Sequence, residues 1–256
     1  MKNRMEVYPL KSSILKSGDS LQESIADALR LGRIRPQNGD IIAVASKVVA
    51  IVEGNMVRLS SVRPSNKAMV LAHRYKMDPE FVQVILNESD KVYSGVKGAL
   101  LTLKDGDAVA NAGVDQKNAP LGYAVLWPSD SDKASRRLRA QMERRYGKKL
   151  GILIVDSRVT PLRLGTVGLA LGCAGFAPVR DLRGSPDLYG RRARITVDAV
   201  ADGLASVAHL VMGESKEQTP FVLVRNSPAM VDGRNRSRSS MLLPSRECLY
   251  MSSIIH

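Results

Sequence analysis

The sequence has few of the residues that would point to a disulfide, zinc or base-stacking architecture. Its 256 residues include only 2 cysteines, Cys173 and Cys248, and 3 histidines. These are too few for a disulfide framework or for a zinc site of the usual ligand spacing, and they predict a reducing, cytoplasmic location. Aromatic residues make up only 4% of the chain, which disfavours an extended platform for stacking nucleic-acid bases.

Long apolar runs and common nucleotide-binding fingerprints are also missing. No stretch approaches the roughly 20 apolar residues that a membrane-spanning helix needs, so we expect no membrane association. The N-terminus, MKNRMEVYPLKSS, carries charges but no apolar core of a signal peptide. There is no G-x-x-x-x-G-K-S/T motif, which excludes a P-loop enzyme.

Positive charge is the most prominent bulk property of the chain. The formal net charge is +13, and much of the excess lies in Lys133–Lys149 and Arg225–Arg246. Such a surplus suits nucleic acid, an anionic membrane surface or small polyanionic ligands. Both stretches are poor in aromatic residues, so we interpret them as a solvated basic face and do not expect a nucleic-acid partner. A site for nucleotide phosphates needs only a few of these charges.

Strand-like and helix-like segments interleave without a regular βαβ repeat, which predicts an α+β fold with mixed sheets and packed helices. Asp40–Glu53 is rich in valine and isoleucine and predicts a buried strand, or two short ones. Gly151–Val155 predicts a short buried strand that ends at Asp156. We further expect helices near Ser65–Lys76, Pro79–Asn87 and Ser131–Tyr146, a strand leading into a polar loop over Ser89–Ala112, and a strand at Phe221–Arg225.

Three other segments complete the expected single domain over residues 1–256. Apolar residues after Thr196 follow the helical period, and Thr196 is the expected N-cap of that helix. The glycine-rich stretch Gly165–Gly175 lacks the dinucleotide fingerprint, so it predicts close packing of the backbone. Asp232–Ser240 is polar and charged and is expected to be mobile.

Two aspartates stand at expected strand ends. Asp115 lies in the glycine-containing loop Asn111–Asn118, a type of loop in which backbone N–H groups can approach an anion. Asp156 directly follows a buried strand and precedes Ser157. Two carboxylates on one magnesium-type cation are a usual device for phosphoryl transfer. A strand-terminal aspartate also commonly forms a turn or caps a helix, so spacing alone leaves both roles open.

Arginines are concentrated in Arg158–Arg194, where glycines and aspartates separate them. Because guanidinium groups bind carboxylate and phosphate in a bidentate way, Arg163 and Arg183 are candidate substrate or phosphate contacts. The alternative is an internal pair, such as Arg183 with Asp187, that holds an irregular loop together. His209 lies on the expected helix and is interpreted as a core or rim histidine. We identify no catalytic residue from the sequence.

Several motifs occur in order between Gly39 and Arg225: GDIIAVASKVV, PSNKAMVLA, ANAGVD, ALGCAGFAPVRDLRG and LVMGE. As a set they resemble the coenzyme F420-0:L-glutamate ligases, and the segment Gly165–Glu214 is the most specific part. The resemblance implies the fold of that family. It also implies the short archaeal form, without the additional C-terminal domain of some actinobacterial members.

The resemblance also implies a reaction. GTP with Mg²⁺ or Mn²⁺ would phosphorylate the terminal carboxylate of the deazaflavin coenzyme precursor, and the α-amine of L-glutamate would attack the acyl phosphate to form an amide. K⁺ is a further candidate cofactor, and a homodimer with sites near the subunit interface is implied. The family's metal positions correspond to Asp115, Asp156 and Ser157, and its nucleotide positions to Ser12, Ser13, Ile14, Leu15, Ser46, Lys47 and Asn118.

Some positions depart from the pattern of the family. Ile51 replaces a lysine expected beside a nucleotide phosphate, where a charge-assisted contact is worth about 1.5–3 kcal/mol. Val159 and Thr160 replace a glycine and an arginine, Gly203 replaces a glutamate, and Lys117 replaces a serine. These changes leave three hypotheses open: the same ligase, a homologous ligase with a changed nucleotide or acceptor, and a non-catalytic paralogue that binds a polyanion.

Overall fold

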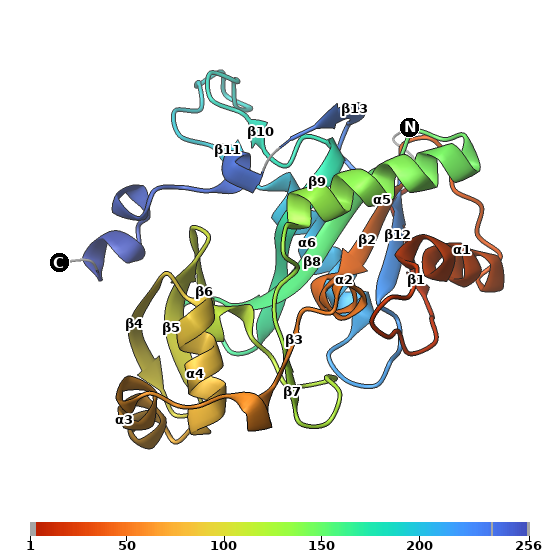
Figure 1. The fold of residues 1–256 in the computed structure, drawn as a ribbon. Coiled ribbons are helices and arrows are strands. Elements are labelled where there is room, and N and C mark those ends of the chain that lie inside the picture. The colour runs from red at the N-terminus through yellow and green to blue at the C-terminus, as the bar shows by residue number, and fades with distance from the viewer. Residues whose placement is uncertain (1–3, 237, 255–256) are drawn as a thin grey trace.

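A six-stranded sheet forms the centre of the computed structural model, which describes residues 4–236 and 238–254 (Figure 1). Its strands, in spatial order, are β1 (Glu6–Leu10), β12 (Phe221–Arg225), β2 (Ile41–Ala45), β8 (Gly151–Val159), β9 (Thr166–Phe176) and β13 (Val231–Asn235). β2 and β8 pair in parallel, whereas the other neighbours pair antiparallel. The predicted α+β class with mixed sheets is therefore confirmed, as is the strand predicted at Phe221–Arg225.

Helices cover both faces of this sheet. They are α1 (Leu21–Leu31), α5 (Ser131–Tyr146) and α6 (Val200–Met212). Ile42 and Val44 of β2 belong to a buried cluster with α1 and α5, and Ile41 and Ala43 belong to a second cluster with α6. Successive strand residues point to opposite faces. Because both faces are buried, β2 is apolar throughout instead of alternating with polar residues.

A smaller lobe with its own buried cluster lies beside the main sheet, at the lower left of Figure 1. It contains α3 (Asn66–Tyr75), α4 (Pro79–Glu88), β4 (Lys91–Val96), β5 (Ala99–Lys104) and β6 (Asp107–Ala110), next to the pair β3 (Met56–Arg58) and β7 (Tyr123–Val125). The side chains of Ser65 and Asp78 cap the two helices by accepting hydrogen bonds from backbone N–H groups. Both predicted helices are confirmed, but the single strand expected over Ser89–Ala112 is three strands.

The strand predicted over Asp40–Glu53 is wrong in its second half. β2 ends at Ala45, and α2 (Ser46–Glu53) begins at the next residue without a side-chain cap. Gly54 ends this helix in the left-handed conformation, with φ at 77°. The β-branched residues of α2 favour a strand locally, but burial of the apolar face of the helix outweighs that preference, and Val49 and Ala50 are fully buried.

The strand predicted to end at Asp156 is longer than expected. β8 continues to Val159, with Asp156 paired to Leu169 of β9, so Asp156 lies inside the strand. β9 contains the glycine-rich stretch except for Gly165, which has open space around it, and the other glycines of the stretch give the close packing that we predicted. A Cβ on Gly168 would lie 2.2 Å from backbone atoms of Ala205, and one on Gly172 would lie 2.7 Å from backbone atoms of Ser131.

The start of α6 also differs from the prediction. Thr196 is not its N-cap, because Val197 and Asp198 form the short strand β11 (Val197–Asp198), which pairs with β10 (Arg180–Asp181). The N-cap of α6 is Ala199, which makes no side-chain hydrogen bond. The remaining elements are the 3-10 helices η1 (Leu59–Ser61), η2 (Asn111–Gly113), η3 (Arg238–Met241), η4 (Ser245–Glu247) and η5 (Met251–Ser253).

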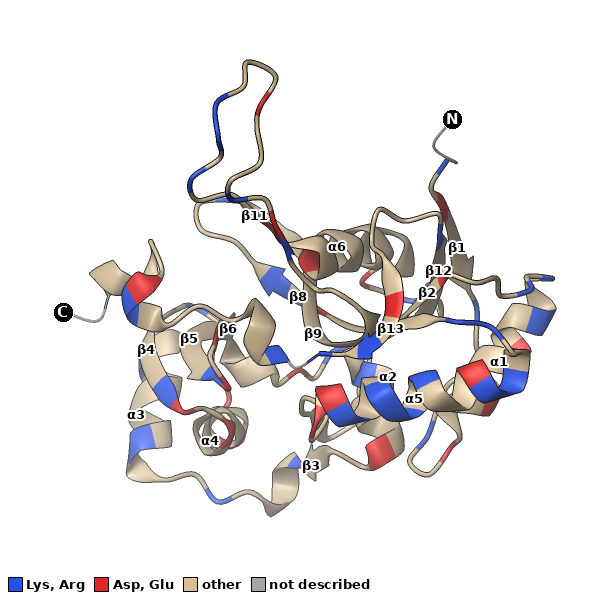
Figure 2. Cartoon of the chain, turned by 90° about the horizontal axis from the view of Figure 1, so that it is seen from above, with Lys and Arg blue, Asp and Glu red and all other residues tan. Residues whose placement is uncertain are grey.

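The segment Asp232–Ser240, expected to be mobile, contains most of β13 and the start of η3, and its residue Ser237 lies outside the described residues. Its mobility and the single-domain organisation of the chain stay predictions. Figure 2 shows lysine and arginine positions along α5, with acidic positions among them. Within the described ranges, no helix combines the length and apolar character that crossing a bilayer requires.

Candidate functional site

A cavity of about 740 Å³ lies where β2 ends, beside residues 155–157 of β8, and its volume is within the usual size range of small-molecule sites. Because β2 and β8 are parallel neighbours, with Ala45 paired to Val155, the next residue of each chain segment comes side by side: Ser46 at the start of α2 and Asp156 within β8. Loops after β1, before β7 and after α6 complete the wall.

Every residue predicted for metal or nucleotide binding lines this cavity. They are Ser12, Ser13, Ile14, Leu15, Ser46, Lys47, Asp115, Asn118, Asp156 and Ser157. They come from separate parts of the sequence and are brought together only by the fold. Their shared position makes a common ligand physically reasonable, while the role of each residue stays a prediction.

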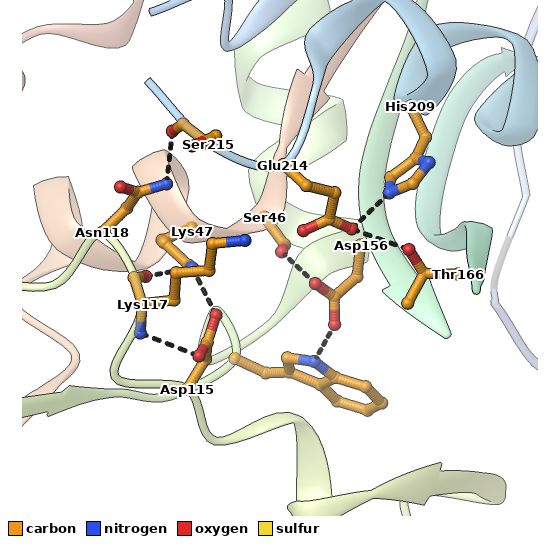
Figure 3. Close-up of polar contacts among 11 residues, drawn as sticks. Ser46, Lys47, Asp115, Lys117, Asn118, Asp156, Thr166, His209, Glu214 and Ser215 are labelled. Carbon is orange, nitrogen blue, oxygen red and sulfur yellow. Dashed lines mark hydrogen bonds and ion pairs between the residues drawn. The ribbon is translucent and has the colours of Figure 1, made fainter. Parts of the chain in front are cut away.

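Asp156 is held by donors on both of its carboxylate oxygens (Figure 3). Ser46 donates through Oγ to Oδ1 at 3.0 Å, and Trp127 donates through Nε1 to Oδ2 at 2.5 Å. Burial raises the pKa of the Asp156 carboxyl above its ordinary value, although the hydrogen bonds from Trp127 and Ser46 oppose that shift. The orientation of the carboxylate is therefore set by two side chains.

Asp115 is held by charge and by the backbone of its loop. Its Oδ2 forms an ion pair with Lys47 Nζ, and its Oδ1 accepts a hydrogen bond from the backbone N–H of Lys117 at 2.9 Å. Asp115 also exchanges two backbone hydrogen bonds with Val125, of 2.8 and 3.0 Å. Lys47 additionally donates to the carbonyl of Lys117, so one ammonium group joins α2 to this loop.

The chain leading to Asp115 has an unusual backbone. Asn111 and Ala112 have φ values of 54° and 52°, in the left-handed region that side chains other than glycine seldom adopt. Hydrogen bonds compensate for this strain: the backbone N–H of Leu100 donates to Asn111 Oδ1, and that of Ala112 donates to Thr102 Oγ1, both at 2.8 Å. The lobe thus fixes the conformation of the loop that presents Asp115.

His209 and Glu214 form a further polar pair in the cavity wall that the sequence reading did not assign to the site. His209 Nε2 lies 2.6 Å from Glu214 Oε1, which also accepts a hydrogen bond from Thr166 at 3.0 Å. Burial raises the pKa of Glu214, but the hydrogen bonds from His209 and Thr166 outweigh it and leave that pKa below its ordinary value. The LVMGE motif, with a glycine that ends the helix, was the available sequence signal.

Asn118 links two loops at the rim of the cavity. Its Nδ2 donates to the carbonyl of Ser215 at 2.8 Å, so the loop after α6 is tied to the loop that carries Asp115 (Figure 3). Residues 215 to 218 line the cavity together with Lys16. This segment is also part of the site that sequence reasoning missed, because its polar residues match no motif of phosphate binding.

The two candidate arginines lie outside the cavity, since neither Arg163 nor Arg183 lines it. Arg183 binds Asp181 in a bidentate way, with Nε 2.9 Å from Oδ1 and Nη2 2.7 Å from Oδ2. This guanidinium lowers the pKa of Asp181 to about 2. The suggested pair with Asp187 is wrong: that carboxylate accepts backbone hydrogen bonds from Tyr189 and Arg191 at the tip of the same loop.

The departures from the family's pattern fall at different distances from the cavity. Ile51 lines it and is 8% exposed, so this position belongs to the cavity wall. Val159 and Thr160 lie beyond the cavity wall, and Val159 is 58% exposed. Gly203 faces open space, where an added Cβ would meet nothing within 4 Å.

The sequence of this chain is similar to one known protein family and to several of its members. A family described as F420-0:Gamma-glutamyl ligase matches residues 9–226. The coenzyme F420:L-glutamate ligase of Methanopyrus kandleri is 38% identical over 248 residues, which cover 95% of this chain and 96% of the relative. The ligase of the same name from Archaeoglobus fulgidus is 37% identical over 223 residues, 87% of this chain and 88% of the relative. That of Methanocaldococcus jannaschii is 35% identical over 252 residues, 97% and 98% of the two chains.

Proposed function

The chain belongs to the F420-0:gamma-glutamyl ligase family and adds glutamate to coenzyme F420-0, and we propose that it does so with GTP and a divalent cation in the cavity beside the end of β2. The resemblance found in the sequence and the ligase class that it implied are therefore confirmed. GTP as the nucleotide, the cation and the dimer are the parts that we propose.

One observation carries this proposal: the predicted metal and nucleotide residues all line a single cavity. These residues come from four segments that are far apart in sequence: the loop with Ser12, the start of α2 with Ser46, the loop with Asp115 and Asn118, and β8 with Asp156. Such convergence requires the main sheet, the lobe and the N-terminal loop to meet at one place. Ligand groups gathered from distant segments in this way are what a bound substrate needs for orientation.

The side chains fit a hard divalent cation. Asp115, Asp156 and Ser157 supply oxygen donors in the wall of the cavity. Among the described residues no group of at least three His, Cys, Asp or Glu side chains could hold a metal alone. This suits Mg²⁺, which proteins commonly bind through one or two carboxylates together with waters and substrate phosphates. A cation there would neutralise charge on the transferred phosphoryl group.

Lysines provide the positive charge for nucleotide phosphates. Lys16, Lys47 and Lys216 line the cavity. Lys47 Nζ contacts Asp115 and the carbonyl of Lys117, and an ammonium group has three N–H donors. One donor of Lys47 is thus available for a phosphate oxygen. We expect Lys47 to join the carboxylate of Asp115 to the nucleotide and to orient both.

The proposed chemistry has two steps. A carboxylate oxygen of the coenzyme precursor attacks the γ-phosphorus of GTP, so that an acyl phosphate forms and GDP leaves. The α-amine of L-glutamate then attacks the acyl carbon, an amide forms, phosphate leaves and the amine loses a proton. The walls of the cavity have to exclude water during the second step, because hydrolysis of the acyl phosphate would waste it.

Binding and turnover measurements test this function. GTP and Mn²⁺ together are expected to raise the melting temperature by mass action, and mixtures with F420-0 and L-glutamate are expected to release GDP and the glutamylated product. Asp115→Asn is expected to abolish turnover. The absence of any shift with every nucleotide–metal pair would refute a nucleotide site in this cavity.

Two parallel assays separate the alternatives. A ligase with a changed nucleotide or acceptor would prefer ATP over GTP, or another carboxylate over F420-0, an outcome motivated by Ile51 in the cavity wall. Comparing GDP release with binding for the same preparations decides among them.

The proposed homodimer is supported by an arm formed by residues 182–196, which extends from the body of the molecule in Figure 2. Backbone hydrogen bonds join its two sides, including Gly184 N–H to the carbonyl of Ala193 at 2.8 Å. Leu188, Tyr189 and Ile195 on the arm are each at least 88% exposed. Large apolar side chains gathered on one projecting segment are typical of an interaction surface.

Light scattering after size exclusion tests the dimer. The unmodified protein is expected to elute as a dimer, and Leu188→Ser combined with Tyr189→Ser is expected to shift it toward a monomer. Leu210→Ser is the matched control, because Leu210 is 82% exposed on α6. A monomer for the unmodified chain, or equal behaviour of the arm and control variants, would contradict the proposal.

A further inference from the structure

Trp127 hydrogen-bonds one aspartate of the cavity and lies against the loop that carries the other, although it does not line the cavity itself. Its indole Nε1 donates to Asp156 Oδ2 at 2.5 Å. The indole N–H is a donor only, so the hydrogen bond has one direction and requires an acceptor. Ser46 donates to the other oxygen of Asp156, and together the two donors define the plane of the carboxylate.

The same edge of the indole lies against the loop that carries Asp115. Gly113 has a φ of 70°, and a Cβ there would lie 2.0 Å from Trp127 Nε1. No side chain other than the hydrogen of glycine fits in that space. The glycine two residues before Asp115 is therefore required by the tryptophan, and the thickness of one indole edge separates the Asp115 loop from the carboxylate of Asp156.

The ring itself is restrained. Trp127 is only 5% exposed, and the cations of Lys104 and Arg238 lie 5.8 and 5.1 Å from the centre of its ring. Each cation is anchored in turn, Lys104 by Glu88 and Arg238 by Asp107. Cation–π contacts of this kind favour one position of the ring. Rotation of the indole away from Asp156 would break these contacts and the hydrogen bond together.

From this geometry we propose that Trp127 is a positioning residue that orients Asp156 and sets its separation from Asp115 for a shared divalent cation. The inference rests on the proposed function, in which these two carboxylates hold the cation. Each carboxylate oxygen keeps a second lone pair, so the hydrogen bonds from Trp127 and Ser46 leave Asp156 able to bind a metal ion. Partners that orient a ligand in this way typically change metal affinity by about 10–100-fold when they are removed.

Mn²⁺ binding to the full chain provides the test, measured by the electron paramagnetic resonance signal of the free ion in the presence of GTP. Trp127→Phe keeps an aromatic ring but removes the N–H donor, and it is expected to weaken Mn²⁺ binding by about 10–100-fold. Phe176→Leu is the control for a loss of stability, because Phe176 is fully buried in the cluster beneath α6. It is expected to lower the melting temperature and to leave Mn²⁺ affinity unchanged.

Trp127 is also the only tryptophan of the chain, so its emission reports on this position in the unmodified protein. Mn²⁺, a paramagnetic quencher, is expected to quench that emission over the same concentrations at which it binds. This measurement does not depend on the folding of any variant. Quenching only at much higher concentrations would overturn the proposal.

The remaining outcomes distinguish the proposed cation site from the positioning role of Trp127. If the unmodified protein binds Mn²⁺ and Asp156→Asn does not, the proposed cation site stands. Wild-type affinity in Trp127→Phe would then overturn the positioning role alone. Equal losses of Mn²⁺ affinity in Trp127→Phe and Phe176→Leu would show that Trp127 has only a structural role, and would also overturn the positioning role. No Mn²⁺ binding by the unmodified protein, with or without GTP, would refute the proposed cation site itself.

Discussion

Ile51 places an apolar side chain in the cavity wall where the resemblance to the family predicts a lysine beside nucleotide phosphate. A charge-assisted hydrogen bond is worth about 1.5–3 kcal/mol. Ile51→Lys is therefore expected to tighten GTP binding by roughly one to two decades, measured by isothermal titration calorimetry with Mn²⁺ present. Ile51→Leu is the matched control and should bind GTP like the unmodified chain. Equal affinities of the two variants would mean that the phosphates lie elsewhere.

Asp40 and Arg225 form a buried ion pair that joins the start of β2 to the end of β12. Arg225 Nε and Nη2 lie 3.0 and 2.8 Å from the two carboxylate oxygens, and the side chain of Asp40 is 1% exposed. Removing one member leaves the other buried without a counter-charge, so Asp40→Ala is expected to lower the free energy of unfolding by about 3–5 kcal/mol. Urea unfolding measures this change.

The exposed pair of Asp27 with Arg30 provides the comparison for that prediction. Its two atoms are 3.0 Å apart, but its side chains are 60% and 76% exposed. Exposed pairs contribute about 0–1 kcal/mol, so Asp27→Ala should change the free energy of unfolding by less than Asp40→Ala does. Similar losses for the two variants would show that burial does not govern the contribution of the Asp40 pair.

At the scale of elements, the contact between β9 and α6 depends on Gly168. A Cβ there would overlap backbone atoms of Ala205 at 2.2 Å, and backbone cannot move aside as a flexible side chain can. Gly168→Ala is expected to push the helix from the sheet and to lower the free energy of unfolding by about 1–3 kcal/mol. Thermal and urea unfolding check this expectation.

Gly203, which lies on α6, is the matched control for Gly168 on β9. An alanine there meets open space, and alanine is about 1 kcal/mol more favourable than glycine within a helix. Gly203→Ala is therefore expected to raise the melting temperature while Gly168→Ala lowers it. Changes of the same sign in both variants would contradict the close approach of β9 to α6.

At the scale of the whole molecule, stability is expected to be greatest at the centre of the main sheet. β2 and β8 lie inside the sheet with helices on both faces, and Ile41, Ile42, Leu153 and Ile154 are fully buried. β13 lies at one edge, and its pairing with β9 is irregular. Amide hydrogen exchange followed by mass spectrometry is expected to be slowest in β2 and β8 and clearly faster in β13. Equal protection would indicate that the whole sheet opens as one unit.

Much of the fold could be predicted where a local pattern and burial agree. The helices α3, α4 and α5 begin after capping residues, and β12 is a short run of apolar residues that ends at Arg225, so composition and caps were enough to predict them. The class of the fold followed from the order of the elements. α2 could not be predicted, because its valines and isoleucine favour a strand and only burial against the sheet makes them helical. β9 was not predicted because glycines have little strand preference. They allow β9 to approach helices that are distant in sequence, and local patterns do not reveal such contacts.

For the site, the sequence by itself determined the lineage and the identity of the oxygen donors. The ordered motifs indicated the family, and Asp115 and Asp156 were recognisable beside apolar segments. Only the tertiary structure decided that these residues line one cavity and that Asp156 lies within β8. It also decided that Arg163 and Arg183 lie outside the cavity. Local spacing could not reveal this, because such contacts depend on which strands pair and not on neighbours along the chain.

The hydrogen bond from Trp127 to Asp156 shows the same division most clearly. The residues are 29 positions apart, and no periodicity or motif connects them. The bond exists because Trp127 packs in the main buried cluster with its indole edge against Gly113, while β8 brings Asp156 to meet it. Composition and motifs therefore determined what chemistry this chain carries, whereas the packing of the lobe against the main sheet decided the geometry in which its carboxylates are held.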